Sequence, residues 1–332
     1  MHEGWWWHPP SDDFDHDEDR ELMTVFYQYS DPFSAECRAF GRLEESGHTD
    51  LAIRCFGYLL LDEKHESAVM RQFGKRIKSF SGAADDSPSD SRDERSRFPG
   101  RDGGNPPIRG IVKELGPQNR VLRASDARQI LRDTVKLQQL GIIQMDLGMH
   151  QLIGGKYVDF SVAVTHPHYI TDRELHTNLT PEWRAKLEWV LFCASIGDYW
   201  EYDYMVRSWN SECKGSVGQA RPGLEISVPA FPGGRVCHVP RYSLRRTPER
   251  DRVYTLVDPR RYDWRSRHIM GRKGRTREGA SEPSRVRLDA RPPRWYLDCN
   301  STLAEDLRKR HTDACGVAWN YKDGLFTPTR LW

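Results

Sequence analysis

The sequence has no hydrophobic run long enough to cross a membrane and no closely spaced pair of cysteines. Its most apolar stretch, residues 189–196, is far shorter than the roughly 20 residues that a spanning helix needs. Seven cysteines are scattered without a Cys-x-x-Cys pair. Their odd number, with no secretory signal ahead of them, favours a reducing compartment. We therefore expect a nuclear or cytoplasmic protein that binds neither a membrane nor structural zinc.

Hydrophobic residues are scarce as well, at 37% of 332 residues against 30% charged residues. A chain of this length can bury a sizeable core, but this composition predicts segments that stay outside it. Residues 1–20 predict a disordered acidic tail. Residues 79–106, rich in Ser, Asp, Arg, Gly and Pro, predict a disordered insertion. Residues 235–294 hold 18 Lys and Arg against 7 Asp and Glu, which predicts a basic, loop-rich insertion.

Residues 141–161 are the most informative part of the chain, because two aspartates flank a predicted hairpin there. A Gly-Gly pair between short runs of strand formers fits a two-residue turn with positive φ. The register of that turn returns Asp159 beside Gln151, just after the loop that carries Asp146. Paired carboxylates with a nearby amide oxygen can orient a hydroxyl and hold magnesium in phosphotransfer. The alternative is an ordinary surface hairpin that two aspartates happen to flank.

This arrangement resembles the catalytic loop and the metal loop of the protein-kinase-like superfamily. The resemblance implies that Asp146 is the base that orients the attacking hydroxyl. It also implies two magnesium ligands: Gln151, which stands where the superfamily carries asparagine, and Asp159, which opens an Asp-Phe-Ser in place of Asp-Phe-Gly.

The elements expected before this region follow the order of a kinase small lobe. Residues 23–29 are rich in β-formers, Asp31-Pro32 predicts the start of a helix that runs through Glu45, and residues 53–61 predict a buried strand. Glu36 lies in that helix. The resemblance implies that it holds the lysine that positions the nucleotide, and a solvated glutamate on the helix surface is the alternative.

Three further elements are expected after the first insertion. Residues 108–115 predict the strand that enters a hinge between two lobes. There the resemblance implies that backbone groups around Glu114 and Leu115 contact adenine, and an ordinary buried strand is the alternative. Two helices are expected to begin at Ser125 and at Pro181. The first has apolar residues at helical spacing, namely Ile130, Leu131, Val135, Leu137 and Leu140.

Residues 31–43, 54–61, 107–114 and 154–161 are similar to a narrower family of fungal kinase-like proteins. That family is named for Fta-two, a kinetochore subunit of the Sim-four complex. The family resemblance implies protein partners, among them kinetochore subunits. It also implies an α+β, protein-kinase-like fold of two lobes.

In that fold, residues 21–115 form a small lobe that is truncated or degenerate, with the disordered insertion inside it. Residues 116–332 form a mainly helical large lobe.

The chain departs from an active kinase at three points. Alignment of residues 22–27 with the corresponding family strand puts Thr24 where the nucleotide-positioning lysine should lie, and no glycine-rich turn precedes it. Gln151 is one methylene longer than asparagine, at a magnesium site that demands near-ideal geometry. We therefore predict a pseudokinase scaffold with no cofactor and little or no phosphotransfer. One alternative is an active atypical protein or small-molecule kinase that uses ATP and magnesium. Another is nucleic-acid binding through residues 235–294.

Overall fold

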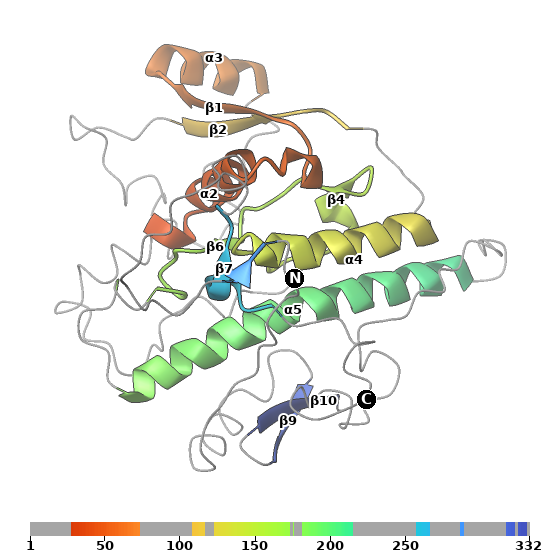
Figure 1. Cartoon of the computed structure of the whole chain (residues 1–332). Helices are drawn as coiled ribbons and strands as arrows, with labels where there is room; N and C mark the ends of the chain where they lie inside the picture. Colours follow the sequence, from red (N-terminus) through yellow and green to blue (C-terminus); the bar gives the residue numbers. More distant parts are fainter. Residues whose placement is uncertain are drawn as a thin grey trace, which may run out of the picture. The chain divides into compact units, whose positions relative to one another are not determined.

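The chain divides into two compact units, Met1–Ile53 with Gly116–Trp332 and Arg54–Leu115 (Figure 1). The computed structural model describes residues 28–73, 108–116, 123–172, 175, 181–214, 257–265, 286–288, 317–322 and 325–330. The expected acidic tail, the expected insertion at residues 79–106 and most of residues 235–294 lie outside the described residues. Thr24 also lies outside them.

Helix α2, Pro32–Glu45, begins and ends where the sequence predicts. Asp31 caps it, because its Oδ2 accepts hydrogen bonds from the backbone N–H of Ser34 at 2.9 Å and from the Ser34 hydroxyl at 2.6 Å. We expected a strand over residues 23–29, but residues 28–30 are helical. The Tyr29 ring lies 5.1 Å from the His168 ring. Such tertiary contacts override the weak strand preference of an aromatic residue.

Helix α2 belongs to the larger unit, although we expected residues 21–115 to form one lobe. Its Arg42 donates from Nη1 to the backbone oxygen of Leu140 at 2.6 Å. The Arg42 guanidinium also lies 3.8 Å from the ring of Trp264, and burial lowers its pKa to about 10. These contacts tie the helix to segments about 100 and 220 residues further along the chain.

The smaller unit contains β1 (Cys55–Leu61), α3 (Glu63–Phe73) and β2 (Ile108–Lys113). The two strands pair antiparallel, with Leu61 opposite Ile108. The expected strands are present, but the expected burial is wrong: Phe56, Tyr58 and Leu60 are 58%, 66% and 55% exposed. Among the described residues each of these strands has a single strand neighbour, and α3 contacts β1 without burying these side chains.

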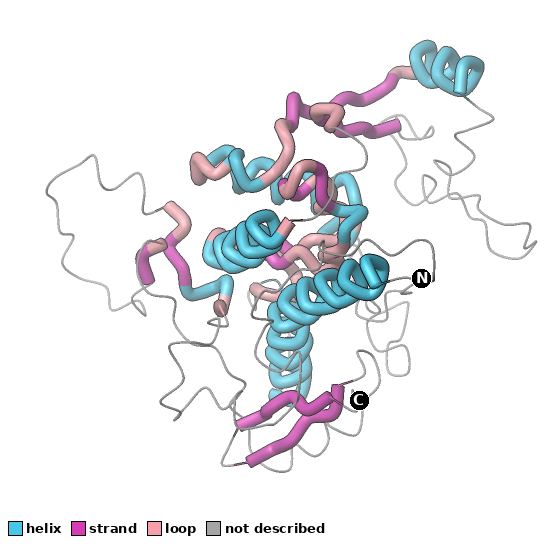
Figure 2. The backbone as a smooth tube through the Cα atoms, turned by 90° about the vertical axis from the view of Figure 1, so that its right-hand side faces the viewer, coloured by secondary structure: helices cyan, strands magenta, loops and turns pink. Residues whose placement is uncertain are grey.

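Two long helices form the core of the larger unit. Helix α4, Ala124–Gln139, starts one residue before the predicted position, and α5, Pro181–Lys214, starts at the predicted proline. The two helices contact each other and lie side by side in both views (Figures 1 and 2). Of the apolar residues expected on the first helix, Val135 is half-buried and the others are buried: Ile130, Leu131, Leu137 and Leu140.

Short strands lie between and after these helices. Strand β3 (Ile142–Ile143) pairs with β6 (Val164–Thr165), and β4 (Leu152–Ile153) pairs with β5 (Lys156–Tyr157). A 3-10 turn, η3 (Met149–Gln151), lies between β3 and β4, and another, η1 (Thr49–Leu51), follows α2. The C-terminal part contains η7 (Pro259–Arg261), the parallel pair β7 (Tyr262–Asp263) and β8 (Val286–Arg287), and the hairpin of β9 (Val317–Lys322) and β10 (Leu325–Arg330). A search of the described helices found none long and apolar enough to cross a membrane.

Candidate functional site

The predicted Gly-Gly hairpin is confirmed. Gly154 and Gly155 have φ of 63° and 80°, and Leu152 lies opposite Tyr157. The backbone N–H of Val158 donates to the oxygen of Gln151 at 3.0 Å, which extends the predicted register one residue beyond the strands. The hairpin therefore returns the chain toward the loop that precedes it.

Asp146 and Gln151 are in direct contact, a pairing that the sequence did not predict, since we expected Asp159 beside Gln151. The Gln151 side-chain amide donates to Asp146 Oδ2 at 2.7 Å, and His150 Nε2 lies 3.8 Å from the same oxygen. Gln151 is buried, whereas the Asp146 side chain is 48% exposed. The Asp146 carboxylate is thus held at one oxygen and remains accessible to solvent.

Asp159 is joined to the Asp146 loop by a residue that sequence reasoning missed. The buried side chain of Gln144 donates from Nε2 to the backbone oxygen of Asp159. The Asp159 carboxylate itself accepts from the backbone N–H of Ser161 at 2.8 Å. Gln144 therefore links the two aspartate segments through one side chain. Only its position, two residues before Asp146, could have pointed to it.

A second missed residue, Asp198 on α5, anchors the loop. Its two carboxylate oxygens accept from the backbone N–H groups of Gln144 at 3.0 Å and Met145 at 2.8 Å, and from the Gln138 side chain at 3.0 Å. Burial raises the pKa of Asp198 to about 6, and the hydrogen bonds act in the opposite direction. A sequence signal for it is an aspartate within the apolar run of a predicted helix.

The backbone next to the candidate base is strained. Met145 has a φ of 70°, which is uncommon for a residue other than glycine. Such a conformation persists only where the surrounding structure holds it. Here the hydrogen bond from the Met145 N–H to Asp198 holds it, one residue before Asp146.

Glu36 of α2 also reaches the site. It is 8% exposed, and its Oε1 accepts from the backbone N–H of Phe160 at 3.3 Å. The fully buried Phe160 ring packs edge-on against Phe40, with ring centres 5.2 Å apart. Since Phe160 follows Asp159 directly, helix α2 holds the second aspartate segment from another side.

The residues that we expected to contact adenine belong to the smaller unit, not to the unit that holds this cluster. Glu114 and Leu115 follow β2 in the smaller unit, and Leu115 is 92% exposed. The backbone N–H of Glu114 already donates to the oxygen of Arg54 at 2.8 Å, so the β-ladder uses it. A nucleotide would have to compete with that hydrogen bond.

Two residues of the cluster suit magnesium in number and type. Asp159 offers a carboxylate, and Gln151 offers the amide oxygen that is left when its nitrogen binds Asp146. Magnesium is commonly held by one or two carboxylates together with substrate phosphates and water. Across the described ranges no group of three or more His, Cys, Asp or Glu residues could hold a metal ion. A magnesium ion held by these two residues would therefore have to take its remaining ligands from water and from a bound nucleotide.

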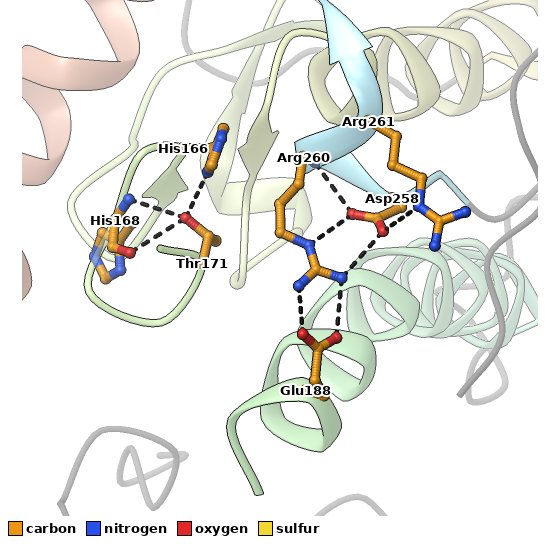
Figure 3. Close-up of polar contacts among 7 residues, drawn as sticks. All are labelled: His166, His168, Thr171, Glu188, Asp258, Arg260 and Arg261. Carbon is orange, nitrogen blue, oxygen red and sulfur yellow. Dashed lines mark hydrogen bonds and ion pairs between the residues drawn. The ribbon is translucent and has the colours of Figure 1, made fainter. Parts of the chain in front are cut away.

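Two arginines of the basic insertion are paired with carboxylates (Figure 3). Arg260 forms two hydrogen bonds with Glu188 of α5, at 2.7 and 2.9 Å, and others with Asp258. Burial alone would lower the pKa of Arg260, but these carboxylates outweigh it and raise the pKa above its usual value. Arg261 pairs with Asp258 at 3.1 Å. These two cations serve contacts within the chain.

Figure 3 also shows a hydroxyl that joins two histidines. Thr171 Oγ1 lies 2.7 Å from His166 Nδ1 and accepts from the backbone N–H of His168 at 2.9 Å. Burial lowers the pKa of His168 to about 3, so this imidazole is neutral near pH 7. The group belongs to the core beside α2, not to the aspartate cluster.

The larger unit thus holds two acidic loops fixed on a helical core. A family model described as Kinetochore Sim4 complex subunit FTA2 matches residues 2–164. That range includes α2, the Asp146 loop, the hairpin and Asp159, so the resemblance to the family named for Fta-two is confirmed over these residues. A search of curated proteins and a search of solved structures each found no match.

Proposed function

We propose that this chain is a kinase-like, kinetochore-associated subunit that works by binding protein partners, with little or no phosphotransfer. The family match over residues 2–164 supports the kinetochore association, and with it a nuclear location and protein partners. The kinase-like assignment is supported by the cluster of Asp146, Gln151 and Asp159 on two linked loops.

The observation that carries the kinase-like assignment is the double attachment of the Asp146 loop. Asp198 binds the two backbone N–H groups that precede Asp146, and Gln144 binds the segment of Asp159. An ordinary surface hairpin needs no buried carboxylate beneath it, because water can satisfy its backbone groups. A site that must present two carboxylates at fixed positions does need such support.

The proposal of weak phosphotransfer rests on Glu36. In the resemblance this glutamate would hold the lysine that positions the nucleotide phosphates, whereas here its Oε1 binds the backbone of Phe160. Thr24 stands at the aligned lysine position. Without that cation the site loses one of the charges that orient ATP. Glu36 instead supports the Asp159 segment through this hydrogen bond.

The kinetochore role is tested in living cells. The full chain, fused to a fluorescent protein and expressed in a fungal host, should coincide with a centromeric histone marker at mitosis. Uniform nuclear fluorescence, with no enrichment at the marker, would refute this role.

Nucleotide binding is tested on the purified full chain. We expect no rise in melting temperature with ATP and magnesium, since a ligand that binds only the native state would raise it. A rise that Asp159→Asn abolishes would show that the metal site works and would contradict the pseudokinase proposal.

An active atypical kinase is the second candidate, and the half-exposed carboxylate of Asp146 favours it. Gln151 holds one oxygen of that carboxylate, which leaves the other available to accept the proton of an acceptor hydroxyl. Phosphate transfer from ATP to a protein or small-molecule acceptor, lost in Asp146→Ala, would establish this function. No transfer above the level of Asp146→Ala would dismiss it.

A further inference from the structure

We draw no further inference here: the strongest candidate, the exposed apolar surface of the two-stranded sheet of β1 and β2, carries none because nothing in the described part of the structure shows what covers it.

Discussion

The carboxylate of Asp198 binds the backbone N–H groups of Gln144 and Met145 at 3.0 and 2.8 Å, across more than 50 residues of sequence. One buried side chain thereby fixes the strained turn that leads into Asp146. Both oxygens are needed, because each accepts one of the two backbone hydrogen bonds.

Asp198→Asn should destabilise the protein at pH 7 by about 2–3 kcal/mol, because an amide offers one acceptor and leaves one buried N–H without a partner. The free energy of unfolding in urea measures this. Glu212→Gln, an exposed change on the same helix, should shift it by less than about 0.5 kcal/mol. Equal unfolding midpoints for the two variants would show that the anchor contributes nothing.

Replacement of glycine by alanine should destabilise the protein at position 155 and stabilise it at position 197. Gly155 has a φ of 80°, whereas Gly197 lies within helix α5, and a Cβ at either position would meet no atom within 4 Å. Gly155→Ala should cost about 1–2 kcal/mol from backbone strain. Gly197→Ala should raise the free energy of unfolding by roughly 0.5–1 kcal/mol, because alanine has the higher helix propensity. Thermal unfolding of both variants checks the signs, and a stabilising Gly155→Ala would contradict the positive φ of the turn.

Substitution of the adjacent residues Arg260 and Arg261 should change the free energy of unfolding by very different amounts. Arg260→Gln leaves the largely buried carboxylates of Glu188 and Asp258 with less compensation, which should cost about 2–4 kcal/mol. Arg261 is 61% exposed, so Arg261→Gln should cost less than about 1 kcal/mol. Urea unfolding of the two variants tests the difference, and an Arg261 effect as large as that of Arg260 would count against it.

Burial of Asp133 predicts a pH-dependent contribution to stability. Burial raises its pKa to about 6, although Gln129 donates to its Oδ1 at 2.6 Å. The folded state thus prefers the protonated form. Protonated Asp133 therefore contributes up to roughly 3 kcal/mol to the free energy of unfolding. This contribution is fully present below the unfolded pKa near 3.8 and is lost as pH rises through about 6.

Asp133→Asn removes this titration. Its stability relative to wild type should therefore be higher at pH 7 than at pH 4.5, which unfolding curves at both values measure. Asp62→Asn is the control, because hydrogen bonds from His65 lower the pKa of the exposed Asp62 below its ordinary 3.8. Its difference from wild type should therefore stay nearly constant between pH 4.5 and pH 7. A constant difference for Asp133→Asn across this range would mean that its carboxyl does not titrate abnormally.

Local chemistry made several elements predictable. Asp31-Pro32 predicted the start of α2, and Gly154-Gly155 predicted the turn, its positive φ and its register. These features depend on residues within a few positions of each other. The contact between Asp146 and Gln151 is also local, since they are five residues apart, but we had expected Asp159 as the neighbour of Gln151.

The burial of β1, and the residues that hold the Asp146 loop in place, were much harder to predict. The apolar run of β1 predicted a strand correctly and its burial wrongly, because composition does not say how many layers cover a sheet. Gln144 and Asp198 were missed as functional residues, since neither belongs to a recognisable motif and each depends on a distant partner.

The sequence by itself determined the helix start at Asp31 and the glycine reversal at Gly154 and Gly155. Only the tertiary structure decided that Glu36 supports Phe160, 124 residues away, and that Asp198 carries the Asp146 loop. The physical reason is the separation in sequence of the interacting residues. Turn and cap geometry follow from neighbouring dihedral angles, whereas a buried carboxylate finds its N–H partners only when the whole core closes around it.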